Sequence, residues 1–436
     1  MVKQTEFPVQ PPVVLLPSPG IDWQKWAVIA CDQYTSNREY WEKVRRFVGD
    51  HPSTLNLILP EVYLEDPDVE ERLQRIKATM DDYLQTKVLT PLAPGYILID
   101  RQTPHVRSRK GLLAAIDLEQ YDWRPGAKSL IRSTEETIAS RLPARIKIRQ
   151  GGALELPHIL LLLDDPGQTV IEPLFQQREK LPKVYDFDLM MQSGHLTGYH
   201  LTNPELIRQL NQALANLAAP AACAQKYGIE GETLLLAVGD GNHSLATAKA
   251  CWEEIKKKAA NPAEIASHPA RFCMVEIINL YDEGLTFHPI HRVLFKVDPA
   301  DFFAALQAYY YCRIEDAPAP SAPIPPGTHA FSFVTNAAAG RVLIHNPGSN
   351  LVVGSLQKFV DHYLAGHPEA KIDYVHGDRE AETLGRQPGN IGLLLPAMDK
   401  HELFKTVILD GALPRKTFSL GEADEKRFYL EARKIL

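Results

Sequence analysis

The chain has 436 residues, of which 45% are hydrophobic and 23% are charged, and its formal net charge is −7 at pH 7. This length exceeds what one ordinary hydrophobic core holds, so we expect two or three domains. The composition excludes a disordered chain, and the acidic balance gives no electrostatic footprint for bulk binding to nucleic acid or to an anionic membrane.

Cysteine usage and the N-terminus indicate a reduced, cytoplasmic protein. The five cysteines are scattered and have no CxxC spacing, which argues against both a disulfide framework and a zinc knuckle; they are Cys31, Cys223, Cys251, Cys273 and Cys312. The first residues contain no apolar signal core, and no apolar run approaches the roughly 18 residues of a membrane span.

The first third of the chain predicts alternating strands and helices. Residues 26–30 form an apolar run that predicts a strand, and a helix is expected over 38–48, with Ser36 or Asn37 as its cap. A longer amphipathic helix is expected over 66–85. Residues 96–101 and 111–118 predict two strands of one sheet.

The region that follows combines a predicted helix start with a basic cluster. Ser133 and Glu136 have the spacing of a capping box, so we expect a helix to begin there. A strand is expected over 158–163. The basic cluster could meet an anion, although a solvated face is the better interpretation; its members are Arg141, Arg145, Lys147 and Arg149.

Two histidines lie close together after a predicted strand at residues 271–280. His288 and His291 are three positions apart, but Pro289 requires an extended path, so the two side chains should not share a helical face as metal ligands. We therefore predict no metal site. A role for His291 and Arg292 in proton transfer or phosphate binding fits better.

The rest of the chain predicts a separate α/β region. Residues 317–326 are rich in proline and read as a stiff linker. A hairpin (330–335 and 341–345), a helix (356–364), a strand (391–395), a helix from residue 399 and a charged final helix after residue 422 follow. The expected architecture is a multi-domain α/β fold with mixed sheets and domains at 1–185, 186–316 and 317–436.

The central predicted domain contains the stretch around which the chain is organised. Residues 234–238 predict a buried strand, and an apolar stripe after residue 244 predicts a helix. Between them stand Gly239, Asp240, Gly241, Asn242, His243 and Ser244. The glycines permit positive φ or close backbone approach, and the helix start could hold a phosphate or carboxylate beside Asp240 and His243.

A simpler interpretation of this turn is structural. Asp240 or Asn242 could only cap the helix, and His243 could be a polar surface residue. One cap needs a single such residue, whereas this turn has an aspartate, an asparagine, a histidine and a serine within five positions. That density favours a functional site.

Several ordered motifs resemble the domain-of-unknown-function family 1015. They are the turn at 239–244, the segment 111–121 before it, the His-Pro-Ile-His-Arg-Val segment at 288–293 and the Pro-Arg-Lys-Thr loop at 414–417. The resemblance covers nearly the whole chain. Lys416 in the last of these loops could contact an anionic ligand or merely lie in solvent, and the family itself has no settled activity.

Residues 186–255 also resemble the nucleotide-binding core of the ParB and sulfiredoxin superfamily, which includes free-serine kinases. The resemblance implies that the turn lies against nucleotide phosphates and that Asp240 acts on a substrate hydroxyl. This chain departs from the commoner pattern, which has histidine at the position of Asn242 and arginine at that of Ser244. Losing the arginine removes a bidentate phosphate contact.

Together, these patterns predict a protein that binds a nucleotide or another phosphorylated small molecule, with a kinase-like phosphotransferase activity. Asp240 and His243 would be catalytic, and the other residues of the turn, with His291, Arg292 and Lys416, would hold the ligand. Mg²⁺ with ATP or ADP follows if the ligand is a nucleoside polyphosphate. The alternative is a non-catalytic ligand-sensing or partner-binding protein. The residues specify no oligomeric state.

Overall fold

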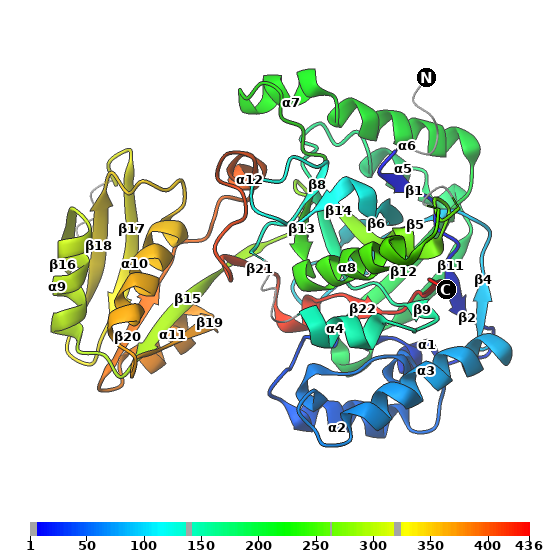
Figure 1. The fold of residues 1–436 in the computed structure, drawn as a ribbon, viewed down its shortest axis with the longest axis horizontal. Coiled ribbons are helices and arrows are strands. Elements are labelled where there is room, and N and C mark those ends of the chain that lie inside the picture. The colour runs from blue at the N-terminus through cyan, green and yellow to red at the C-terminus, as the bar shows by residue number, and fades with distance from the viewer. Residues whose placement is uncertain (1–6, 137–141, 262–263, 318–323) are drawn as a thin grey trace. The chain divides into compact units, whose positions relative to one another are not determined.

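The computed structural model describes residues 7–136, 142–261, 264–317 and 324–436. It divides into two compact units, Met1–Leu285 with Gly421–Leu436, and Thr286–Leu420 (Figure 1). These bounds differ from the three predicted ranges, because the expected boundary at 185 falls inside a strand of the first unit and that at 316 lies within the second. Arg141 and residues 318–323 of the predicted linker lie outside the described residues.

The first unit is built on a ten-stranded mixed sheet. Its order is β11 (Lys183–Asp188), β12 (His195–Leu201), β5 (Tyr96–Gln102), β6 (Arg109–Asp117), β14 (Phe272–Asn279), β10 (Leu160–Leu163), β13 (Leu236–Asp240), β8 (Ile131–Arg132) and β7 (Tyr121–Asp122), and β1 (Val9–Gln10) pairs with β6. Three neighbouring pairs, β10–β14, β13–β8 and β7–β8, are parallel. The predicted mixed α/β class is confirmed, and so is the placement of β5 and β6 in one sheet, where they pair antiparallel.

Alternate residues of a strand point to opposite faces of the sheet. Here the side chains on both faces are buried. On β5, Ile97 and Ile99 join a cluster with side chains of α2 (Arg38–Val48) and α3 (Val69–Gln85). Tyr96 and Leu98 join a second cluster with side chains of α6 (Pro204–Leu217) and α8 (Asn242–Lys258). The unit therefore has three layers, and its short helices are α1 (Trp23–Trp26), α4 (Leu142–Arg149), α5 (Glu172–Phe175) and α7 (Pro220–Tyr227).

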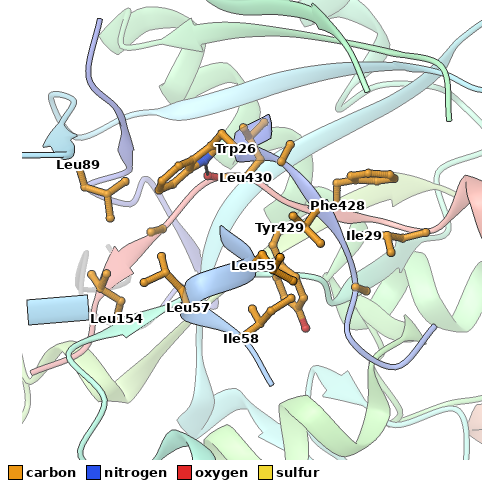
Figure 2. Close-up of a cluster of buried hydrophobic side chains, with 14 of the residues drawn as sticks. Trp26, Ile29, Leu55, Leu57, Ile58, Leu89, Leu154, Phe428, Tyr429 and Leu430 are labelled. Carbon is orange, nitrogen blue, oxygen red and sulfur yellow. Dashed lines mark hydrogen bonds between the residues drawn. The ribbon is translucent and has the colours of Figure 1, made fainter. Parts of the chain in front are cut away.

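The C-terminal segment returns to the first unit as strands, so the predicted final helix is wrong. β22 (Phe428–Tyr429) pairs with β3 (Val28–Ile29), and β23 (Arg433–Lys434) pairs with β9 (Leu154–Glu155). Figure 2 shows this segment among buried side chains, with the Trp26 indole donating a hydrogen bond of 2.8 Å to the Leu430 carbonyl. Arg427, Glu431 and Arg433 of this segment are buried in ion pairs, which a solvent-exposed helix would not require.

The second unit has a seven-stranded sheet with helices on both faces. The order is β16 (Cys312–Asp316), β18 (Ala339–His345), β17 (Thr328–Val334), β20 (Asn390–Leu394), β15 (Phe287–Phe295) and β19 (Lys371–His376), and β21 (Phe418–Leu420) pairs with β15. Side chains of α9 (Pro299–Tyr309) and α10 (Val352–Gly366) pack in one cluster, and those of α11 (Asp378–Gly385) in another. α12 (Leu403–Asp410) completes the unit, and the predicted hairpin of β17 and β18 is confirmed.

Local signals located some helix starts correctly and others not. Asn37 caps α2, as the sequence predicts, and Asn203 caps α6. The capping box at Ser133 is wrong for the described residues, because 133–136 are not helical and the Ser133 hydroxyl donates to the Glu135 carbonyl. Among the helices that the structure describes, none is both long and apolar enough to cross a membrane.

Candidate functional site

The turn between β13 and α8 leaves the start of the helix without a side-chain cap. Gly241 is the N-cap residue with φ of 84°, and the expected cap by Asp240 or Asn242 is absent there. Instead, Asp240 Oδ1 accepts a hydrogen bond of 2.8 Å from the Gly241 amide. A Cβ on Gly241 would lie 3.0 Å from Ile159 Cγ1, so both φ and space require glycine. Gly239 lies in β13, one residue before Asp240.

Asp240 forms an ion pair with Lys426 from the C-terminal segment. Lys426 Nζ lies 3.2 Å from Asp240 Oδ2, and the side chains are 10% and 26% exposed, respectively. Burial raises the pKa of Asp240, but the charges of Lys426 and His158 and the hydrogen bonds from Lys426 and Gly241 outweigh it. The pKa therefore lies below the usual 3.8, and Asp240 is ionised at neutral pH.

A chain of four hydrogen-bonded side chains lies at the same helix start. Ser244 Oγ is 3.0 Å from His158 Nε2, and His158 Nδ1 is 3.1 Å from the Tyr429 hydroxyl. That hydroxyl is 3.0 Å from Cys31 Sγ. Burial and the charge of Asp32 raise the pKa of Cys31 to about 12, so its thiol stays protonated. Ser244 and His158 are partly exposed, while Tyr429 is buried.

The other two polar residues of the turn differ in their surroundings. Asn242 is buried, and its Oδ1 accepts hydrogen bonds from Ser133 Oγ at 2.5 Å and from the Thr134 amide at 3.2 Å. This amide side chain therefore anchors the start of α8 to the loop after β8. His243 is partly exposed, and its carbonyl accepts a hydrogen bond from Thr247 Oγ1.

His291, in the second unit, is buried and oriented by two hydrogen bonds. Its Nδ1 accepts from the Leu395 amide at 3.1 Å, and its Nε2 lies 2.7 Å from Asp378 Oδ1. Because Nδ1 is an acceptor, the ring proton is on Nε2 and points at the carboxylate. His288 and His291 lie three residues apart on one strand, which confirms the predicted extended path and places the two side chains on opposite faces.

Arg292, also in the second unit, is fully buried and donates its hydrogen bonds inside that unit. Its guanidinium contacts the carbonyls of Ile290, Arg415 and Lys416, and lies over the Tyr374 ring at 5.1 Å from the centroid. The Lys416 side chain is exposed. The structure thus joins Arg292 to the Lys416 loop, whereas the residues of the Asp240 turn belong to the first unit.

Sequence reasoning missed the partners of the turn. The sequence predicts a helix for Lys426 and Tyr429 and a strand for His158, and it assigns Cys31 no role. These four side chains come from three distant segments of the chain, and no motif or spacing connects them. The signal that could have found them is the mixture of apolar and charged residues at 426–435, which fits a buried segment better than an exposed helix.

Solved structures resemble this chain only distantly. They include a free serine kinase variant in complex with AMP (11% identity, 74% of this chain and 91% of that chain, TM-score 0.41). A conserved hypothetical protein from Pyrococcus furiosus matches at 12% identity over 74% and 94% of the two chains, with a TM-score of 0.38. SbnI from Staphylococcus aureus matches at 9% over 71% and 82%, with a TM-score of 0.37. At these values the likeness carries no inference about ligand or reaction.

No curated protein matches the chain. None of the comparisons shows a ParB or sulfiredoxin-like segment, which stays a prediction. The sequence profile of one family matches residues 15–363, well over half of the chain. The chain therefore belongs to the family described as protein of unknown function (DUF1015).

Proposed function

We propose that the first unit binds a nucleotide or another phosphorylated small molecule at the turn between β13 and α8. The observation that carries the proposal is the Lys426–Asp240 ion pair at the start of a 17-residue helix that has no side-chain cap. Amide groups of the first helical turn and the positive end of the helix favour an anion. Lys426 adds a cation next to them.

The same residues support phosphoryl transfer. Asp240 is ionised, so its carboxylate can accept the proton of a substrate hydroxyl as that hydroxyl attacks phosphorus. Lys426 would then turn from Asp240 towards the phosphate and neutralise charge in the transition state. His243 and Ser244, in the first turn of α8, would contact the phosphate oxygens. With a nucleoside polyphosphate, Mg²⁺ would neutralise the remaining charge.

One observation favours the non-catalytic alternative, in which the protein senses a ligand or binds a partner. The pKa of Asp240 lies below its usual value, which makes the carboxylate a weak base while Lys426 remains its partner. In that case the loop between β13 and α8 would bind its ligand without catalysing a reaction. A D240N variant distinguishes the two functions. It should still bind the ligand in either case, and it should lose a turnover that the wild type shows only if the protein is an enzyme.

Calorimetric titration of the full chain tests the proposal. ATP, ADP, AMP and inorganic phosphate are titrated with and without MgCl₂. Lys426→Gln should weaken binding about tenfold, since it removes one charged hydrogen bond to the anion. Lys434→Gln, an exposed lysine of the same C-terminal segment, is the matched control and should bind as the wild type does. Absence of binding with all four ligands contradicts the proposal.

A further inference from the structure

We propose that Ser244 is a nucleophile activated by His158, and that the transferred phosphoryl group passes through a phosphoserine at this position. The identity of the molecule that donates the phosphoryl group rests on the proposed function. The nucleophile itself rests on separate geometry, because Ser244 and His158 are joined by their own hydrogen bond, although His158 also lies close enough to Asp240 to lower its pKa.

Ser244 is the third residue of α8 and lies in the first helical turn. The positive end of a helix stabilises negative charge that develops on a side-chain oxygen there. Ser244 Oγ is 3.0 Å from His158 Nε2, which is within reach for direct proton transfer. Both residues are partly exposed.

His158 is oriented from behind by Tyr429. The Tyr429 hydroxyl is 3.1 Å from His158 Nδ1, and the two rings meet edge to face with centroids 5.3 Å apart. When Nδ1 carries the ring proton and donates it to the Tyr429 oxygen, Nε2 is left as the acceptor that faces Ser244. The Tyr429 proton then points to Cys31 Sγ, 3.0 Å away.

This order of residues matches the logic of a nucleophile, a base and a group that orients the base. Here the orienting group is a neutral tyrosine held among buried side chains, where Figure 2 shows it with Leu55 and Ile58. Burial, with the neighbouring Cys31 and Asp32, raises the pKa of Tyr429, so its hydroxyl stays protonated. Tyr429 is accordingly a positioning residue.

The reaction proceeds in two balanced steps. Ser244 Oγ gives its proton to His158 Nε2 and forms a bond to the terminal phosphorus of the donor, while the bond from phosphorus to the bridging oxygen breaks and the diphosphate leaves with the electron pair. In the second step a substrate hydroxyl loses its proton to Asp240 and attacks phosphorus. The bond from phosphorus to Ser244 Oγ breaks, and Oγ takes back the proton from His158.

Two labelling reactions on the full chain test this inference. A fluorophosphonate probe reports the nucleophilicity of a serine without any nucleotide, and ATP with MgCl₂ reports phosphoryl transfer. Peptide mass spectrometry should find both adducts on Ser244, and Ser244→Ala should abolish them. His158→Gln should slow labelling by the probe about 100-fold, the scale of general base catalysis. Ser18→Ala, which removes a hydroxyl that only donates to the Lys87 carbonyl, is the matched control and should label normally.

Tyr429→Phe tests whether Tyr429 orients His158, because a purely structural role would not change how the labelling rate depends on pH. Without the tyrosine oxygen the imidazolium loses a hydrogen bond, so the labelling rate should fall and its midpoint in pH should shift downward. Circular dichroism confirms that each variant is folded. Labelling of Ser244 by the probe in a protein that binds no nucleotide supports the nucleophile and rejects the proposed ligand. Calorimetric binding of ATP with neither adduct on Ser244 overturns this inference and leaves the proposed function standing.

Discussion

Lys426 and Asp240 are 186 positions apart in the sequence, yet their charged groups lie 3.2 Å from each other. The contact exists because the C-terminal segment returns to the first unit after the whole second unit has been completed. The turn after β13 therefore acquires its cation from the end of the chain. A site made in this way is complete only when the last residues are folded onto the sheet.

Asp240→Asn should lower stability at neutral pH, and this loss should shrink in acid. The folded-state pKa of Asp240 lies below its usual 3.8, so its ion pair stabilises the protein above that pH and the contribution is lost as pH falls through the folded value. Because the side chain is 26% exposed, we expect a difference of about 1 kcal/mol at pH 7. Urea denaturation of both proteins at pH 7 and pH 3 measures it. A difference that does not shrink as the pH is lowered from 7 to 3 would assign the effect to packing instead.

Gly241→Ala should be considerably more destabilising than Gly228→Ala. Both glycines have positive φ, 84° and 71°, but a Cβ at position 241 meets Ile159 at 3.0 Å, whereas one at position 228 meets nothing within 4 Å. We expect a cost of about 1 kcal/mol at position 228 for the backbone alone and about 3 kcal/mol at position 241. Equal costs in denaturant titrations would show that Ile159 moves aside.

His195 should stabilise the β11–β12 hairpin in mild acid and not in base. Its Nδ1 is 2.7 Å from Asp188 and its Nε2 is 2.6 Å from Asp186. Burial lowers the pKa of His195, but the hydrogen bonds and charges of the two aspartates raise it above 6.5 overall. The stabilisation is therefore present below pH 6.5 and lost as pH rises through the folded pKa. His195→Gln should lose no more than about 0.5 kcal/mol at pH 5.5, since solvent screens these groups, and nothing at pH 9.

Glu155→Leu should strongly destabilise the first unit. This buried carboxylate pairs with Arg433 at 2.6 Å and with Arg149, and accepts a hydrogen bond from the Met274 amide. Leucine would leave both arginines without their counter-ion, which costs about 3–5 kcal/mol. Thermal unfolding measures the loss. Glu254→Gln, which breaks an exposed pair with Lys257, is the control and should leave the melting temperature unchanged.

Elements with local causes could be predicted from the sequence. Asn37 caps α2 because its side chain accepts a hydrogen bond from the Tyr40 amide, three residues ahead. The β13–turn–α8 arrangement was likewise predicted from five apolar residues, two glycines and a helical stripe. In each case the decisive interaction lies within a few residues of the signal.

The candidate site could be predicted only in part. Its turn was identified, but Asn242 proved to be buried against Ser133 and Thr134, and Arg292 against backbone carbonyls of its own unit. The same type of polar residue can anchor a helix or bind a ligand, and the sequence does not distinguish these two roles. Burial and hydrogen-bond partners distinguish them.

The sequence by itself determined the helix caps, the strands and the glycine turn, because short-range hydrogen bonding and hydrophobic periodicity act within one segment. Only the tertiary structure decided that residues 426–435 form buried strands, that Lys426 faces Asp240, and that His158 stands between Ser244 and Tyr429. The physical reason is that pairing between distant segments depends on which surfaces the whole fold brings together. The charge of a lysine in the sequence does not specify the carboxylate that it will meet.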